Sequence, residues 1–99
     1  MIPDPKYNVD DLVYWGGHNS IIILGRGYRR LTNKWWYILD RPGLIGIHWL
    51  RNACDDVYYN RSKLDGANEI FLGVQEEFIL PMKYMRPAIT DTCSGFDLL

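Results

Sequence analysis

The apolar residues of this chain gather in short runs that are separated by turn-forming residues. The runs are KYNVDDLVYW near the start, SIIILGRG and KWWYIL in the middle, and EIFLGVQEEFILP towards the end. Each is bounded by Gly, Pro, Asn or Asp, which are the residues that most often end a strand. The pattern predicts a small, strongly bent β-barrel, and therefore an all-β or mainly β fold. Barrels of this size serve as recognition scaffolds more often than as enzymes.

The first two predicted strands are apolar on both faces. Residues 9–15 alternate with a period of two, yet each face carries apolar groups, as in a strand that is partly covered on both sides. Residues 21–24 are β-branched or Leu and are the strongest candidate for a buried strand. Gly25 and Gly27 flank Arg26, which predicts a bulge or sharp bend that curls the sheet.

The later strands are shorter. Residues 35–39 alternate so that Trp35 and Trp36 point to opposite faces, and the two rings therefore cannot both lie in the core. At least one ring is expected at the surface or beneath the segment that follows. The last strands are predicted at 69–72 and 78–80, with a tight turn or a single 3₁₀ turn between them.

Residues 44–66 admit two interpretations. Their apolar positions recur at steps of three and four residues: Ile47, Leu50, Cys54, Val57 and Tyr58. This spacing favours a short helix of about three turns. The aromatic and β-branched content also suits a hairpin, so the helix is the preferred interpretation and the hairpin its alternative.

Length and composition indicate one domain that spans residues 1–99. Within it, residues 1–8 are expected to be an extended lead-in because Pro3 and Pro5 oppose helix, and 88–99 a tail with little to hold it. Four Trp in a chain that is 14% aromatic exceed what so small a core readily buries, which hints at a contact surface. The net charge of −1 opposes a strongly basic domain but allows a local basic patch.

The cysteines and the opening residues indicate an intracellular protein. Cys54 and Cys93 are the only cysteines and are expected as free thiols rather than as a disulfide. The opening MIPDPKYN has no apolar stretch typical of a signal peptide, and no apolar run is long enough to cross a bilayer. The sequon Asn60-Arg61-Ser62 therefore predicts no glycosylation. A place in a virus particle or another large complex is compatible with these features.

Two motifs carry a resemblance to a known family. Residues 7–13, YNVDDLV, have the form aromatic-x-Val-x-Asp-x-Val, and residues 74–81 read VQEEFILP. The first resembles the opening strand, and the second the closing 3₁₀ turn and final strand, of SH3-like barrels of the Tudor and KOW type. The Trp-Tyr pair in the third strand fits the same family, whereas Asp10 stands where its pattern has Gly.

The resemblance covers roughly residues 7–40 and 69–81. It implies a five-stranded SH3-like barrel into which residues 41–68 are inserted, with a short helix in the insertion. Members of this family bind modified peptides, proline-rich peptides, RNA, DNA or other subunits. The resemblance therefore implies a binding module and leaves its ligand open.

Residues that could hold a metal or act as a nucleophile lack the required spacing. His48, Cys54, Asp55 and Asp56 are close in sequence, but the paired ligands at short spacing that mark zinc sites are missing. Cys54 combined with His48 or His18 has no local signature of an oxyanion site. A small buried Cys beside a solvated acidic turn explains the pattern better.

Two other constellations are equally weak. Adjacent carboxylates such as Glu76 and Glu77 face opposite sides of a strand and do not converge on one substrate. The segment Gly25-Arg26-Gly27 lacks the other glycines and the Lys of a phosphate-binding loop. We therefore expect no catalytic residue, no metal and no cofactor.

Residues 26–41 combine positive charge with aromatic rings. The segment holds five cations against one carboxylate, a balance of +4, so the remainder of a chain of net charge −1 carries −5. Seven residues of this segment are predicted to bind a partner: Arg26, Tyr28, Arg29, Arg30, Lys34, Trp35 and Trp36. Exposed rings with guanidinium groups suit an acidic protein surface, and they also suit the phosphates and bases of a nucleic acid. Alternatively, the cations solubilise a hairpin whose rings lie in the core.

The preferred function is a non-enzymatic interaction module, or a small accessory subunit of an assembly, that docks another protein through exposed aromatics and this Arg-rich hairpin. Nucleic-acid binding through residues 26–41 is the alternative. The third hypothesis is an enzyme that uses Cys54. Separately, an aromatic cage for a methylated cation would need Tyr14 or Trp15, one of Trp35 and Trp36, and Tyr37 to converge.

Overall fold

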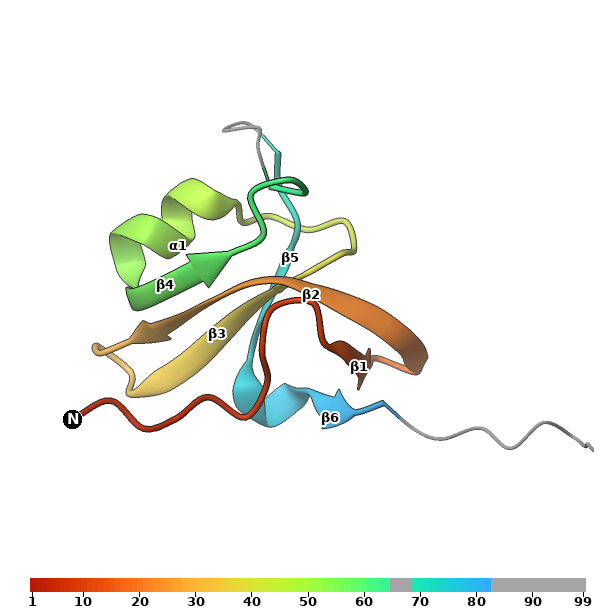
Figure 1. Cartoon of the computed structure of the whole chain (residues 1–99), viewed down its shortest axis with the longest axis horizontal. Helices are drawn as coiled ribbons and strands as arrows, with labels where there is room; N and C mark the ends of the chain where they lie inside the picture. The colour runs from red at the N-terminus through yellow and green to blue at the C-terminus, as the bar shows by residue number, and fades with distance from the viewer. Residues whose placement is uncertain (65–68, 83–99) are drawn as a thin grey trace, which may run out of the picture.

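The protein folds mainly into β-structure, as shown by a computed structural model that describes residues 1–64 and 69–82 (Figure 1). Its elements in chain order are β1 (Leu12–Trp15), β2 (His18–Arg29), β3 (Lys34–Leu39), α1 (Ile47–Ala53), β4 (Asp55–Tyr59), β5 (Leu72–Gln75), the 3₁₀ turn η1 (Glu76–Phe78) and β6 (Leu80–Pro81). The predicted tail 88–99 lies outside the described residues.

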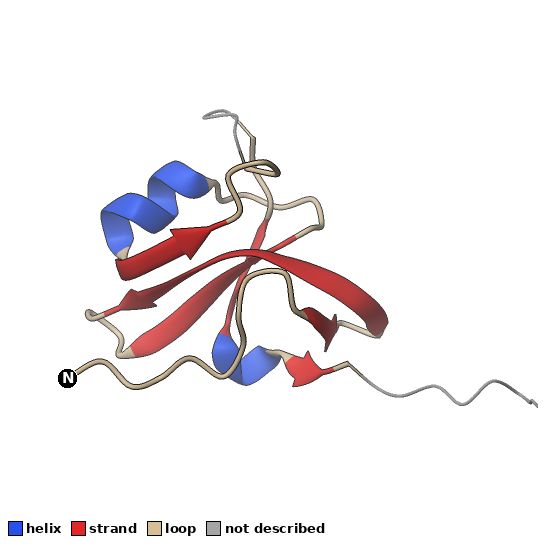
Figure 2. Ribbon diagram, viewed as in Figure 1, coloured by secondary structure: helices blue, strands red, loops and turns tan. Residues whose placement is uncertain are grey.

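The strands form one antiparallel sheet in the order β5-β3-β2-β1-β6, and β4 pairs with β2 beside this path. The long strand β2 pairs with β1, β3 and β4, and it curves strongly along its length (Figure 2). The predicted bend is confirmed, because the pairing register with β3 shifts between Ile23 and Gly25. The sheet is open: its order ends at β5 and β6, and no described pairing joins these two strands. The mainly β prediction is thus confirmed, without a closed five-stranded barrel.

The central strands β2 and β3 are buried on both faces because their side chains alternate between two apolar clusters. One cluster lies under β1, η1 and the first residues of the chain: Tyr7, Val13, Ile21, Ile23, Tyr28, Trp35, Tyr37, Leu39, Val74 and Ile79. The other lies under α1 and the loop after β4: Leu24, Ile38, Ile47, Leu50, Cys54 and Leu64. We call these the first and the second core. The continuous apolar runs in the sequence result from this burial on two sides.

The ambiguous segment contains both a helix and a strand. Helix α1 has only seven residues, shorter than predicted, and ends where Cys54 adopts an extended backbone. The following residues form β4, which pairs with β2 beyond the residues that pair with β1. Gly27 allows this close packing, since a Cβ there would lie 2.7 Å from the Cβ of Cys54.

The strands near the ends of the sheet begin later than predicted. The predicted strand 69–72 is observed as β5 and the predicted strand 78–80 as β6, while the 3₁₀ turn between them is confirmed as η1. Val74 pairs with Tyr37 in the first core, whereas Ile70 is 55% exposed. Packing against β3 therefore determines where β5 begins, and local propensity alone placed this strand too early in the sequence.

The first strand also begins late, after a turn at Asp10. Asp10 has φ 76°, in the left-handed region that favours glycine, and its N–H donates to the carbonyl of Ile23 at 2.8 Å. The position where the SH3-like pattern has Gly thus has the backbone conformation that Gly adopts readily, and Asp tolerates it better than most residues. Within the described residues no helix is long and apolar enough to span a bilayer.

Candidate functional site

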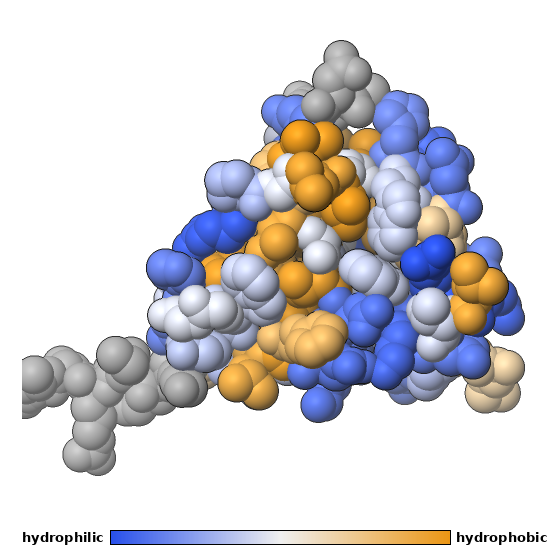
Figure 3. All heavy atoms as spheres, turned by 180° about the vertical axis from the view of Figure 1, so that it is seen from behind, coloured by the Kyte–Doolittle hydropathy of each residue, from blue (hydrophilic) through white to orange (hydrophobic). Residues whose placement is uncertain are grey.

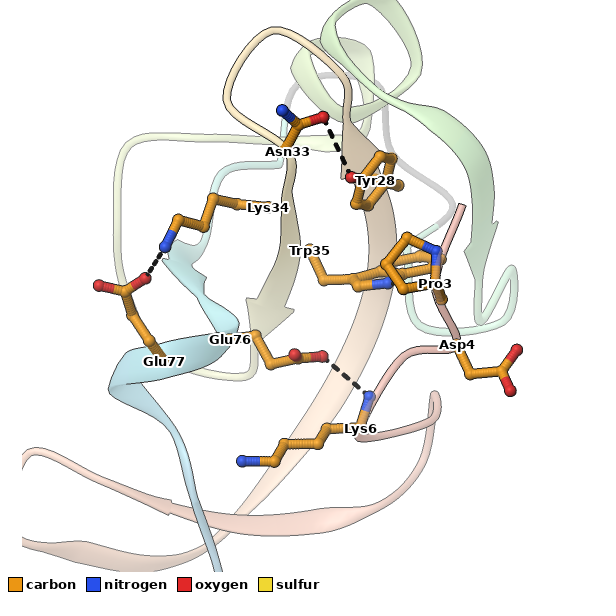
Figure 4. A pocket seen from close by; sticks show the side chains of 9 residues that line it. All are labelled: Pro3, Asp4, Lys6, Tyr28, Asn33, Lys34, Trp35, Glu76 and Glu77. Atoms are coloured by element: carbon orange, nitrogen blue, oxygen red, sulfur yellow. Dashed lines mark hydrogen bonds and ion pairs between the residues drawn. The ribbon is translucent and has the colours of Figure 1, made fainter. Parts of the chain in front are cut away.

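A pocket of about 310 Å³ lies between the β2–β3 hairpin, η1 and the first residues of the chain (Figure 4). Its lining residues are Pro3, Asp4, Lys6, Tyr28, Asn33, Lys34, Trp35, Glu76 and Glu77. We call residues 1–6 the N-terminal strap and the pocket, together with the surface that the strap covers, the Trp35 groove. The strap contains no helix and no strand and runs past the hairpin towards η1 (Figure 1).

Trp35 forms the wall of the groove on which the strap lies. Its indole N–H donates to the carbonyl of Pro3 at 2.9 Å, and only 3% of the residue is exposed. Tyr28 meets the indole edge-on, with ring centroids 5.4 Å apart, and Arg26 lies over the same indole at 5.6 Å. Figure 4 shows Pro3 beside the indole. The single polar atom of a buried ring is thus satisfied by a main-chain carbonyl of the strap.

Glu76 holds the other end of the strap. One oxygen of its carboxylate accepts the backbone N–H of Lys6 at 2.8 Å and the hydroxyl of Tyr37 at 2.7 Å. The hydroxyl of Tyr37 in turn accepts the backbone N–H of Tyr7 at 3.3 Å. Burial, and then the hydrogen bond to Glu76, raises the pKa of Tyr37 well above its usual range, so Tyr37 remains a donor to Glu76.

The rim of the groove is charged. Lys34 and Glu77 form an ion pair across it, with side chains 45% and 47% exposed. The hydroxyl of Tyr28 donates to the amide oxygen of Asn33 at 3.2 Å, which links the turn of the hairpin to the end of the ring. The groove therefore combines an aromatic wall, one ring N–H, one carboxylate and a solvated ion pair.

The structure divides the predicted partner-binding residues between two places. Tyr28, Lys34 and Trp35 line the groove, and Arg26 lies behind it, between Trp35 and Tyr58. Arg29, Arg30 and Trp36 lie elsewhere: Arg29 is over Trp49 at 5.6 Å, Arg30 pairs with Asp55 at 2.5 Å, and Trp36 meets Trp49 edge-on at 5.2 Å. The set predicted from the sequence is therefore not one surface.

The expectation of exposed aromatic rings in this segment is wrong for two residues. Tyr28 and Trp35 are buried, because strand alternation directs both into the first core and the strap lies against Trp35. Trp36 is partly buried in the second core beneath the insertion, as the alternation predicted. Sequence reasoning predicted residues 1–8 as an extended lead-in from Pro3 and Pro5, but it assigned neither this segment nor Glu76 to a binding site.

Exposed apolar side chains gather on another face of the molecule (Figure 3). The exposed large apolar side chains among the described residues include Leu44 at 90%, Phe78 at 60%, Ile70 at 55% and Leu80 at 50%. The period-two pattern concealed Ile70, Phe78 and Leu80, because it placed them in the predicted strands 69–72 and 78–80. Nothing in the described structure covers this surface, whereas the Trp35 groove has a segment seated in it.

The residues considered for nucleophilic catalysis, metal binding and an aromatic cage lack the geometry that each of these sites requires. Burial raises the pKa of the Cys54 thiol to about 11, the opposite of what a nucleophile requires. Within residues 1–64 and 69–82, no three His, Cys, Asp or Glu side chains gather closely enough to hold a metal ion. Tyr37 is fully buried with its hydroxyl on Glu76, so it offers no open face to an aromatic cage.

No protein-family model, no curated protein and no solved structure matches this chain. The function is therefore argued from the geometry of the groove.

Proposed function

We propose that this protein is a non-enzymatic module that docks a partner protein, and that the Trp35 groove receives an extended segment of that partner. The observation that carries the proposal is the strap itself. A segment without helix or strand lies in the groove and is held by the indole N–H of Trp35 and the carboxylate of Glu76.

The contacts suggest which segments the groove accepts. Trp35 binds a main-chain carbonyl and Glu76 binds a main-chain N–H three residues later, so neither contact depends on a particular side chain. Both groups are free in an extended segment, whereas a helix would use them internally. Proline favours such a segment, because it stiffens the chain and lies well against aromatic walls. The ligand class is therefore an extended, proline-containing peptide.

The order of the strands supports a finer proposal for the fold. Strands β1, β2, β3 and β5 pair as consecutive neighbours, and after η1 the chain returns to pair β6 with β1. We infer that this sheet is an SH3-like barrel in which α1 and β4 belong to an insertion. The 3₁₀ turn before the last strand and the left-handed backbone at Asp10 agree with that inference.

The alternative of nucleic-acid binding through residues 26–41 has less support. Arg30 and Lys34 are paired with carboxylates, and Arg26 and Arg29 lie over rings of the chain itself. A surface for phosphates needs cations that share one face and are free to release counterions. Membership of a larger assembly and an intracellular location remain predictions.

A selection experiment tests the docking proposal. A displayed library of short random peptides is selected against the full chain, and the enriched peptides are measured on Trp35→Phe and on the matched control Trp36→Phe. We expect proline-containing peptides whose affinity falls about fivefold with Trp35→Phe, the effect of losing one neutral hydrogen bond, and is unchanged with Trp36→Phe. Peptides that bind both variants equally well would refute the groove as the docking site.

A further inference from the structure

We propose that the N-terminal strap is an intramolecular competitor, which occupies the Trp35 groove until a partner segment displaces it. The inference rests on the proposed function and concerns the regulation of the same site. It follows from how the strap is held, where it is anchored, and which atoms it uses.

The strap is held by few contacts. Two hydrogen bonds fix it, from the indole N–H of Trp35 to the carbonyl of Pro3 and from the backbone N–H of Lys6 to Glu76, and its one apolar contact with the first core is made by the partly buried Ile2. Met1, Pro3, Asp4 and Lys6 are exposed, and the strap takes no part in the sheet. Segments with little buried surface and no strand pairing open at low free-energy cost relative to the core.

The residue that follows the strap is firmly anchored. Tyr7 is buried, its hydroxyl donates to the carbonyl of Ile79 at 3.1 Å, and its ring meets Tyr37 edge-on at 5.7 Å. The strap can therefore leave the groove by rotation near Lys6 while Tyr7 stays in the first core. While Tyr7 stays in place, the strap remains tethered beside its own site, and a tethered segment binds at a high effective concentration.

The strap and a partner segment exclude one another because they need the same atoms. The indole of Trp35 has one N–H, and Glu76 already accepts two donors at one oxygen. If the strap leaves, the ring N–H loses its acceptor and the aromatic wall becomes exposed, which is unfavourable unless another carbonyl takes its place. The groove is thus occupied either by the strap or by a partner segment of the same chemistry.

The test uses the full chain and a defined probe. The variant Ile2→Ser, Pro3→Gly, Pro5→Gly removes the apolar contact and the stiffness of the strap but keeps its carbonyls and N–H groups. The probe is a synthetic peptide with the sequence of residues 1–6, blocked at both ends. Binding is followed by NMR through the indole signal of Trp35 and the amide signals of Lys34 and Glu77. The matched control is Leu31→Ser, at an exposed position of the hairpin that does not line the groove.

We expect the triple variant to bind the peptide about tenfold more tightly than the unaltered chain, because the apparent affinity rises with the fraction of open groove. Leu31→Ser should bind as the unaltered chain does. Adding Trp35→Phe to the triple variant should weaken binding about fivefold. Pro5→Gly alone, which perturbs the fold least, should give an intermediate gain of about threefold and serves as the second variant if the triple variant does not fold.

Equal affinity in the unaltered chain and both strap variants would overturn competition by the strap, as would a peptide that shifts no groove signal. This failure differs from failure of the proposed function. If library peptides still depend on Trp35 while loosening of the strap has no effect, docking stands and the competition is wrong. If the peptides also bind independently of Trp35, both proposals are wrong.

Discussion

The two faces of the β2–β3 sheet are covered in different ways, although the same strands supply both. On the first face Trp35 donates its N–H to Pro3, beside the hydrogen bonds of Tyr37 and Glu76. On the second face Trp36 packs against Trp49, and its ring N–H is buried without a described partner. Neighbouring residues of the same type thus have different environments. We propose that the first face is the one on which a partner segment exchanges with the strap. The second face, in this proposal, stabilises the fold.

The largest expected effect concerns the second core. Leu50 is fully buried there, and Leu50→Ala should lower the free energy of unfolding by about 2–5 kcal/mol because it leaves a cavity. Urea denaturation measures the change, with a substitution at the exposed neighbouring residue, Arg51→Ala, as the control. If Leu50→Ala lowers the free energy of unfolding no more than Arg51→Ala does, α1 does not stabilise the fold through the second core.

The next effect concerns the hydrogen bonds of the first face. Tyr37→Phe removes a hydroxyl that serves Tyr7 and Glu76, and should cost about 1–3 kcal/mol because two polar groups lose their partner. Urea denaturation at neutral pH, compared with Tyr58→Phe at an exposed position, measures it. An unchanged free energy of unfolding would contradict this prediction and show that water replaces the hydroxyl.

The same tyrosine predicts a dependence on alkaline pH. Because the pKa of Tyr37 is raised in the folded state, its contribution to stability is fully present below the unfolded pKa of about 10 and is lost as pH rises above it. We expect stability to fall from pH about 10 upward, and to fall less steeply in Tyr37→Phe. Parallel curves for the two proteins would contradict the assignment.

A smaller effect compares the two neighbouring tryptophans directly. Trp35→Phe loses a hydrogen bond, whereas Trp36→Phe removes a ring N–H that has no partner among the described residues. Both substitutions lose a similar ring volume. Trp35→Phe should therefore destabilise the chain by about 1 kcal/mol more than Trp36→Phe. Chemical denaturation of both variants checks the difference, and the reverse order would remove the basis of the comparison.

The smallest effect is at the rim of the groove. The ion pair between Lys34 and Glu77 is about half exposed, and Lys34→Ala should change stability by less than about 1 kcal/mol because solvent screens the pair. The difference from the unaltered chain should shrink further in high salt. A loss well above this range would show that the rim supports the fold as well as the site.

Much of the fold could be predicted, because burial on two faces leaves a local pattern. The apolar run of residues 21–24, the bend at Gly25 and the opposite directions of Trp35 and Trp36 all follow from strand alternation. The end strands were misplaced, since Glu69 and Ile70 have strand-like neighbours but lie outside the core. Their register depends on packing against β3, which is not a local property.

The candidate site was less predictable than the fold. Tyr28, Lys34 and Trp35 could be selected from their own segment, but their partners Pro3 and Glu76 are distant in sequence. The cations of the same segment were predicted to share one surface with these residues, but apart from Lys34 they do not line the groove. Arg30 and Arg29 contact Asp55 and Trp49 of the insertion instead.

By itself, the sequence determined a mainly β fold, the course of its central strands and the need to cover two apolar faces. These follow from side-chain alternation and turn residues, which act over a few positions. The tertiary structure alone decided that a seven-residue helix and a strand share the insertion, and that the strap lies on Trp35. The reason is physical: an indole N–H and a carboxylate take whichever partner the folded chain brings within hydrogen-bond distance, and that choice is made across long stretches of sequence.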